Sequence, residues 1–233
     1  MLIAGIEPFT LLDFPGKIAC ILFTLGCNFK CGYCHNAQFV KPQKDEFSKN
    51  KIISESSIFQ FLDERRNLLD GVVICGGEPT IQPGIIEFLQ KIKSKGFLIK
   101  LDTNGFKPEV LKQILAAQLI DYVAMDIKSS KKKYSLICGV DVDFSKIEQS
   151  RDLILNSNID SEFRTTVIKG IHDKDEIEDI ANFCKGTKKY VIQNFRDKET
   201  LDPTFKKFTS FSNTELMVFK DIAKKHTKTE VSL

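Results

Sequence analysis

The sequence predicts an α/β fold of six strand–helix units that form an open (β/α)6 partial barrel. Short apolar runs alternate regularly with stretches of helical periodicity along the chain, and such alternation implies parallel strands joined by right-handed crossovers. Six units are fewer than the eight that close a full barrel. From the residues alone, a doubly wound open sheet explains the alternation almost equally well, because the pattern does not decide whether a sheet curls.

Each expected strand is a short apolar run bounded by polar or turn-forming residues. The first, over residues 17–25, contains the uninterrupted run Ile18-Ala19-Cys20-Ile21-Leu22-Phe23, which is typical of a strand buried on both faces. We expect Cys20 to pack inside this strand and not to bind a ligand. The other strands are expected over residues 71–75, 97–101, 122–127, 162–168 and 190–195.

Amphipathic stretches between these strands predict the helices. Ile58 and Leu62 belong to an apolar stripe that follows Ser54, a residue suited to the N-cap position. Gly96 is placed to end the next helix. The helices are expected over residues 54–66, 85–95, 108–117, 144–156, 175–184 and 214–225.

Length and composition indicate one globular domain over residues 1–233. The hydrophobic content of 42% and the charged content of 28% are ordinary for such a domain. The net charge, 34 − 31 = +3, is too small to indicate nucleic-acid binding, and we expect the run Lys131-Lys132-Lys133 to be a solvated loop.

The sequence shows no signal peptide and no apolar run of the roughly 20 residues that cross a membrane. Its seven cysteines, an odd number with three of them clustered, fit a reducing compartment better than a disulfide framework. We therefore expect a cytoplasmic protein that does not bind membranes.

Three of the cysteines lie in one short loop after the first strand. Cys27, Cys31 and Cys34 stand at positions i, i+4 and i+7, with Tyr33 directly before the third. Iron–sulfur clusters are held by cysteine thiolates and usually take four, so three ligands would leave one iron open. A zinc site with His35 as fourth ligand is the alternative, but Cys34 and His35 are adjacent and neighbours rarely bind one tetrahedral metal. Ordinary buried thiols are the remaining possibility.

Further polar motifs follow the expected strands. Gly76-Gly77-Glu78-Pro79 follows the second, Asp102-Thr103-Asn104-Gly105 the third, and Asp126-Ile127-Lys128 ends the fourth. The carboxyl ends of parallel strands are where sites are built, so a composite site is favoured over unrelated loops. The first two motifs also suit simple turns.

The loop from Gly26 to Asn36 resembles the cluster loop of the radical S-adenosylmethionine (SAM) enzymes. The run Glu7-Pro8-Phe9-Thr10-Leu11-Leu12-Asp13-Phe14-Pro15-Gly16-Lys17, with Cys34-His35-Asn36, is similar to the glycyl-radical activating enzymes, and most closely to activators of anaerobic ribonucleoside-triphosphate reductase. The likeness covers nearly the whole chain. It implies a partial barrel of the radical SAM type.

The resemblance also implies the site. Cys27, Cys31 and Cys34 would hold a 4Fe–4S cluster, and Gly76, Gly77 and Glu78 would hold the methionine ammonium group. Asp102, Asn104 and Asp126 would lie near SAM, the two aspartates with a monovalent cation that oxygen ligands suit. Lys128 and Arg164 are candidates for the SAM carboxylate, although a strand arginine is often a salt-bridge partner. The residues expected beside the cluster or adenine are Tyr33 and His35.

The implied activity is reductive cleavage of SAM and hydrogen abstraction from a glycine of a partner enzyme. The cofactor carries the hard chemistry, so no catalytic triad is required. The implied electron donor is a low-potential protein such as a flavodoxin or ferredoxin. No cysteine lies between Cys34 and Cys75, so the insert that carries extra clusters in some activators is missing. An auxiliary cluster of Cys75, Cys138 and Cys184 is not expected.

Several roles stay open at this point. The partner could be another glycyl-radical enzyme of the pyruvate formate-lyase type, or the substrate could be a small molecule. A zinc-stabilised or electron-transfer module is the non-enzymatic alternative. His172 is expected to be a surface histidine, and the segment Gln193-Asn194-Phe195-Arg196 has no role assigned by its chemistry.

Overall fold

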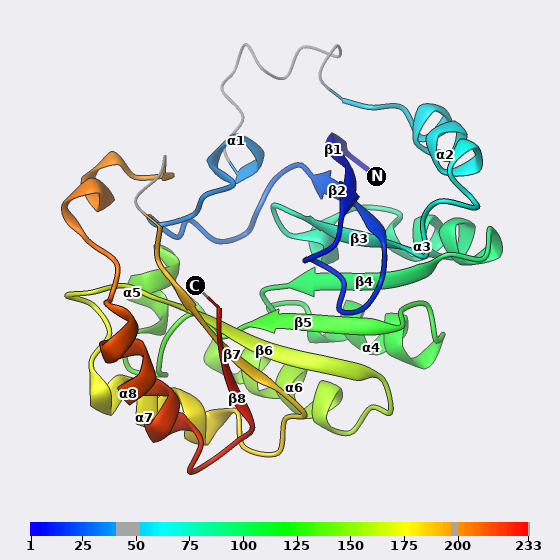
Figure 1. The fold of residues 1–233 in the computed structure, drawn as a ribbon. Helices are drawn as coiled ribbons and strands as arrows, with labels where there is room; N and C mark the ends of the chain where they lie inside the picture. The colour runs from blue at the N-terminus through cyan, green and yellow to red at the C-terminus, as the bar shows by residue number, and fades with distance from the viewer. Residues whose placement is uncertain (41–51, 197–199, 233) are drawn as a thin grey trace. The chain divides into compact units, whose positions relative to one another are not determined.

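The computed structural model describes residues 1–40, 52–196 and 200–232 (Figure 1). The chain divides into two compact units, which are described separately. The first unit comprises Met1–Asn28, Asn36–Thr103 and Lys107–Val123, and the second comprises Phe29–His35, Asn104–Phe106 and Ala124–Leu233.

The first unit contains four neighbouring strands in chain order. These are β1 (Ile3–Thr10), β2 (Ala19–Thr24), β3 (Gly71–Gly76) and β4 (Leu98–Thr103). β1 is antiparallel to β2, whereas β2, β3 and β4 are parallel. β2 is buried apart from Phe23, and Cys20 packs inside it as expected. Ile18, the first residue of the predicted run, precedes the strand and is exposed.

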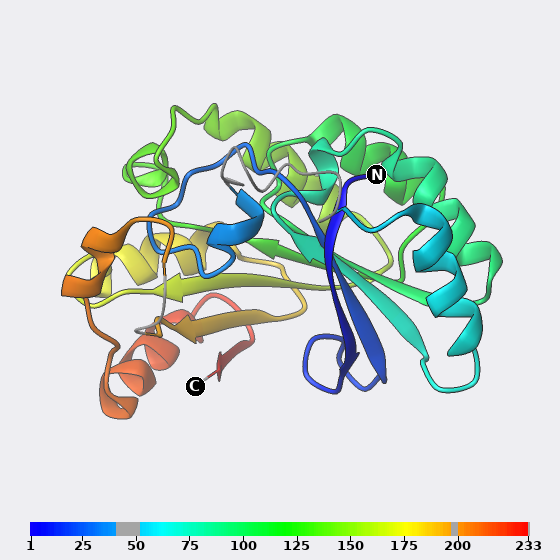
Figure 2. The ribbon, with the colours of Figure 1, turned by 90° about the horizontal axis from the view of Figure 1, so that it is seen from above.

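Helices of the first unit follow the strands. They are α1 (Ala37–Val40), α2 (Glu55–Glu64), the 3₁₀ helix η3 (Pro79–Ile81), α3 (Ile85–Ser94) and α4 (Pro108–Ala116). The Ser54 side chain caps α2 by accepting a hydrogen bond from the Ser57 amide, as predicted. α2 lies beside α3 (Figure 2), and the Phe59 and Phe88 rings join them at 5.4 Å.

The second unit contains the parallel strands β6 (Asp160–Val167), β7 (Tyr190–Asn194) and β8 (Thr229–Ser232). β5 (Tyr122–Asp126) continues from the first unit into the second. The helices of the second unit are α5 (Tyr134–Cys138), α6 (Phe144–Leu155), α7 (Lys174–Phe183), the 3₁₀ helix η4 (Pro203–Lys207) and α8 (Asn213–Ala223). α7 and α8 lie side by side, and α8 packs against β8 (Figure 1).

Every predicted strand and helix is present, and no end differs by more than two residues from its prediction. One difference affects the site. β4 extends to Thr103, so Asp102 and Thr103 belong to the strand and not to the turn after it. Four elements were not predicted, because they are edge or single-turn elements with weak periodicity: β1, β8 and the short helices α1 and α5.

No helix in the described parts of the chain is long and apolar enough to span a bilayer. The run Lys131-Lys132-Lys133 follows β5, and its side chains form ion pairs with acidic residues. Lys131, for example, lies 3.0 Å from Glu148. The prediction of a solvated loop is therefore confirmed.

Candidate active site

The turn after β3 in the first unit lies directly against the start of the cysteine loop. The Gly77 amide donates to the Thr24 carbonyl at 2.9 Å, and the Glu78 amide donates to the Gly26 carbonyl at 2.8 Å. A Cβ atom at Gly77 would lie 1.9 Å from the Gly26 oxygen. Gly76 has a φ of +112°, which suits glycine alone among the common residues. The turn after β3, which lies against the residue before Cys27, therefore requires glycine at both positions.

The Glu78 carboxylate joins the ends of β3 and β4. Its Oε1 atom accepts hydrogen bonds from the Thr80 amide at 3.0 Å, the Thr80 hydroxyl at 2.5 Å and the Thr103 hydroxyl at 2.7 Å. The residue is 1% exposed, so these donors compensate much of the cost of burying its charge. Glu78 thus has a structural role, whatever it contributes to ligand binding.

Asp102 is paired with a lysine that the sequence reading did not single out. Lys100 Nζ lies 2.5 Å from Asp102 Oδ1, and both residues are buried on β4. Residues i and i+2 of a strand point to the same face, so a lysine two positions before the aspartate was a signal available in the sequence.

The second unit holds the rest of the cysteine loop. The Cys34 amide donates to the Cys31 carbonyl at 3.1 Å, and the Lys30 amide donates to the Cys138 carbonyl at 2.8 Å. A hydrogen bond from the Cys138 thiol, with help from Lys128 and against the effect of burial, lowers the pKa of Cys31 to about 7. A thiol with this pKa is readily ionised, which is the state that binds metal.

Residues 201–205, far away in the sequence, contact the cysteine loop. The Asp202 amide donates to the Gly32 carbonyl at 2.9 Å, and the Leu201 amide donates to the Cys34 carbonyl at 3.0 Å. The Phe205 ring of η4 packs on Gly32, where a Cβ atom would lie 2.1 Å from it. No sequence motif pointed to this segment, because its contacts with the loop span about 170 positions along the chain.

The aromatic residues that flank Cys34 differ in their surroundings. Tyr33 is buried, and its hydroxyl finds no hydrogen-bond partner in the described parts of the chain. His35 stacks on Phe195 at 5.6 Å with an interplanar angle of 20°. It also lines a polar pocket of about 290 Å³. The other residues that line it are Thr166, Gln193, Asn194, Arg196 and Ser232. The structure thus brings residues of the segment with no assigned role beside His35.

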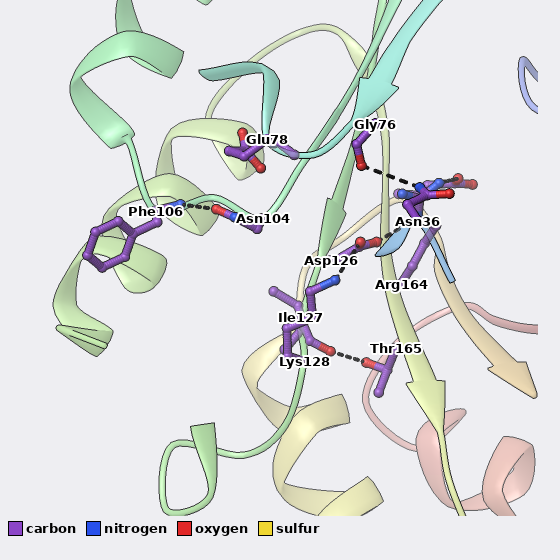
Figure 3. Close-up of polar contacts among 12 residues, drawn as sticks. Asn36, Gly76, Glu78, Asn104, Phe106, Asp126, Ile127, Lys128, Arg164 and Thr165 are labelled. Carbon is purple, nitrogen blue, oxygen red and sulfur yellow. Dashed lines mark hydrogen bonds and ion pairs between the residues drawn. The ribbon is translucent and has the colours of Figure 1, made fainter. Parts of the chain in front are cut away.

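Asp126, Lys128 and Arg164 form one ion-pair cluster in the second unit (Figure 3). Asp126 Oδ2 lies 2.9 Å from Lys128 Nζ, and Asp126 Oδ1 lies 2.9 Å from Arg164 Nε. Burial alone would raise the pKa of Asp126, but Arg164 and Lys128 together lower it well below its usual range. The three side chains, expected separately near SAM, thus pair with one another, and the aspartate is ionised at neutral pH.

Two loop residues adopt other environments. The Asn104 side chain accepts from the Phe106 amide at 3.0 Å, which closes the turn that Asn-Gly predicts (Figure 3). The expectation of a surface His172 is wrong. The residue is 3% exposed, and its Nδ1 accepts from the Ile168 amide at 3.1 Å, because the turn after Gly170 folds the ring inward.

The cysteines outside the loop are scattered over both units. Cys75 is half-buried on β3, while Cys184 is fully buried at the end of α7, where burial raises its pKa well above the ordinary value. Cys138, unlike Cys75 and Cys184, contacts the cysteine loop, because its thiol donates a hydrogen bond to Cys31. This contact was not anticipated, because the two residues are far apart in sequence.

The loop chemistry fits an iron–sulfur cluster. No disulfide engages any of the seven cysteines. Cys27 belongs to the first unit, and Cys31 and Cys34 to the second. In the described residues no three His, Cys, Asp or Glu side chains are already arranged to hold a metal ion. Three reduced thiols in eleven residues, one with its pKa near neutrality, form the soft donor set that such a cluster takes.

Comparison with known proteins gives the class. Residues 21–184 match the model of the radical SAM superfamily, and the chain belongs to that superfamily. It is 38% identical over 230 residues, 97% of this chain and 92% of the relative, to a Methanocaldococcus jannaschii protein assigned as a glycyl-radical enzyme activating enzyme. The chain is therefore an enzyme of the glycyl-radical activating group, as its motifs indicated.

One further relative belongs to the same group, and a solved structure shares the fold. The pyruvate formate-lyase-activating enzyme of Clostridium pasteurianum is 28% identical over 86% of this chain and 91% of its own length. The crystal structure of Streptococcus suis SuiB bound to S-adenosylmethionine has a TM-score of 0.65, with 15% identity, over 91% of this chain and 52% of SuiB. The predicted α/β fold of the radical SAM partial-barrel type is confirmed. Family membership implies a 4Fe–4S cluster and SAM as cofactors, and a glycyl-radical enzyme as partner.

Proposed function

We propose that this enzyme installs a glycyl radical on anaerobic ribonucleoside-triphosphate reductase and that Cys27, Cys31 and Cys34 hold its cluster. The observation that carries the cluster assignment is the spacing of these three cysteines in one short loop, none of them in a disulfide. The partner rests on the resemblance of residues 7–17, together with Cys34-His35-Asn36, to the activators of this reductase.

When bound, the cluster supplies the electron that cleaves SAM. The protein's own residues bind and orient the cofactor. In the first unit, the absence of side chains at Gly76 and Gly77 is proposed to let backbone oxygens approach the methionine ammonium group closely, and Glu78 fixes this bend through Thr80 and Thr103.

In the second unit, Arg164 and Lys128 are proposed to bind the SAM carboxylate. Both side chains already pair with Asp126, which holds their charged heads in place before any ligand arrives. Tyr33 and His35 are proposed to lie beside the cluster or the adenine. The buried Tyr33 hydroxyl supports this, because a polar group of this kind is normally satisfied by a ligand or water.

The remaining features of the proposal follow from composition and family. We propose one radical SAM domain over residues 1–233 and a low-potential flavodoxin or ferredoxin as electron donor. A reducing, cytoplasmic location is supported by the seven cysteines without a disulfide. No role for nucleic acid or membrane is proposed.

The test is anaerobic reconstitution with iron and sulfide, reduction, addition of SAM, and quantification of 5′-deoxyadenosine with and without the candidate reductase. We expect nucleoside formation together with a glycyl radical signal on the reductase in electron paramagnetic resonance. The control variant Cys31→Ala should lose the cluster and the cleavage, and nucleoside production by that variant would contradict the cluster assignment.

A second candidate partner is a pyruvate formate-lyase type enzyme, favoured by the similarity to the Clostridium pasteurianum activator. The same assay with that enzyme in place of the reductase separates the two. Nucleoside formation without a radical on either protein would point to a small-molecule substrate instead. The zinc or electron-transfer module is not retained, because the chain belongs to an enzyme family.

A further inference from the structure

We infer that Lys100 supplies, from within the protein, the positive charge that Asp102 would otherwise take from a monovalent metal ion. This inference rests on the proposed function, since it concerns the expected cation at the SAM site. SAM binding by this enzyme would then need neither K⁺ nor Na⁺ at Asp102. Lys100 would act as a positioning residue for that aspartate.

The geometry of β4 is the first support. Lys100 Nζ lies 2.5 Å from Asp102 Oδ1, a short charge-assisted hydrogen bond. The two residues are 1% and 8% exposed. Because they stand at i and i+2 on one strand, the backbone itself fixes the pair on one face of β4.

The electrostatics are the second support. A positive partner offsets the cost of burying a carboxylate, and a lysine ammonium is a compact cation with three donors. The Tyr122 ring, 5.9 Å from Lys100 Nζ, adds a cation–π contact. A metal ion on Asp102 would lie within a few ångströms of this ammonium, where repulsion between like charges in a poorly solvated site is strong.

Asp126, the second aspartate of the expected cation site, is also paired with positively charged side chains. Asp126 is paired with Lys128 and with Arg164, each at 2.9 Å. Each aspartate, within its own unit, therefore has a side-chain cation. The residues present do not fit an additional monovalent ion at Asp102.

The first experiment uses the reconstituted wild-type enzyme. The dissociation constant of SAM is measured in KCl, NaCl and choline chloride at equal ionic strength. We expect the three values to agree within about threefold, because no metal ion is part of the site. A weakening of more than about threefold in choline chloride would overturn the inference.

The second experiment follows thermal unfolding of the cluster-free chain. In Lys100→Met, Asp102 loses its counter-charge and should recruit K⁺, so the melting temperature should rise by about 3 °C or more from choline chloride to KCl. The wild type and the double variant Lys100→Met/Asp102→Asn should change by less than about 1 °C. Lys93→Met is the matched control, since Lys93 pairs with Asp121 in the same unit but is half-exposed.

Failure of the inference differs from failure of the proposed function. If the reconstituted enzyme binds no SAM, the proposed function fails, while the unfolding series still decides whether Lys100 occupies a cation position. No K⁺ response in Lys100→Met would overturn the inference. If that variant does not fold in choline chloride, folding restored by KCl supports the inference, and folding restored only by the Asp102→Asn change contradicts it.

Discussion

Glu78 shows how much of a motif can be structural. One carboxylate oxygen accepts from three donors of Thr80 and Thr103 inside the first unit. The motif Gly-Gly-Glu-Pro indicated ligand binding, but the sequence could not show that its glutamate also joins the ends of two strands. That knowledge requires the register of β3 and β4, which sets Thr103 close to the turn.

We predict that Glu78→Ala lowers the free energy of unfolding of the cluster-free protein by about 3 kcal/mol, because it leaves buried donors unsatisfied. Urea unfolding measures the change. Glu78→Gln retains an acceptor oxygen and should lose less. Glu64→Ala, a surface glutamate on α2, should change stability by no more than about 0.5 kcal/mol. Equal effects of Glu78→Ala and Glu64→Ala would contradict this role.

Lys100, His172 and Cys138 mark the limits of prediction at single residues. The ion pair of Lys100 and Asp102 was predictable from their spacing, because residues i and i+2 of a strand point to the same face. The burial of His172 and the contact of Cys138 with Cys31 depend on how loops fold back. No local pattern encodes such long-range contacts.

At the scale of elements, α7 is joined to the loop after β5 by one glutamate. Glu176 accepts from the Ser129 hydroxyl at 2.5 Å and the Ser130 amide at 2.6 Å, and Lys133 lies 3.1 Å away. Burial opposes ionisation, but these donors lower the pKa of Glu176 from 4.5 to about 2. The ionised carboxylate therefore stabilises the packing of α7.

The sign of the pH dependence follows from this lowered pKa. The stabilisation is fully present above pH 4.5 and is lost as the pH falls from 4.5 towards 2. We predict that Glu176→Gln is less stable at pH 7 by about 1 to 2 kcal/mol and loses less stability over that acid range than the wild type. Urea unfolding at several pH values measures both. Glu148→Gln, at a surface pair with Lys131, should keep the wild-type slope, and an unchanged slope in Glu176→Gln would contradict the prediction.

The elements themselves were predictable where their periodicity was strong. The buried parallel strands and the amphipathic helices α2 and α3 follow from apolar spacing and from caps such as Ser54. β1 was not predicted, because Glu7 and Pro8 interrupt its apolar pattern and its partner is antiparallel. An edge strand is partly solvated, so its sequence is less constrained.

At the scale of the whole molecule, the seven thiols divide by burial. Cys27, Cys34 and Cys75 are half-buried, whereas Cys20, Cys31, Cys138 and Cys184 are buried. We predict that a thiol reagent labels three cysteines of the cluster-free native protein at least about tenfold faster than the other four, and all seven after denaturation.

The same labelling tests the cluster ligands. After reconstitution, Cys27 and Cys34 should be protected, while Cys75 should remain reactive and serve as the internal control. Mass spectrometry of the labelled peptides identifies the sites. Continued rapid labelling of Cys27 and Cys34 in fully iron-loaded protein would contradict their assignment.

The contact between residues 201–205 and the cysteine loop sets an order of events during biosynthesis. Leu201, Asp202 and Phe205 contact the loop at Gly32 and Cys34, yet a ribosome makes them long after the cysteines. A nascent chain that stops short of this segment lacks these contacts with Gly32 and Cys34. On the proposed cluster assignment, we therefore expect stable loading of iron and sulfide only after residues 201–205 have been made.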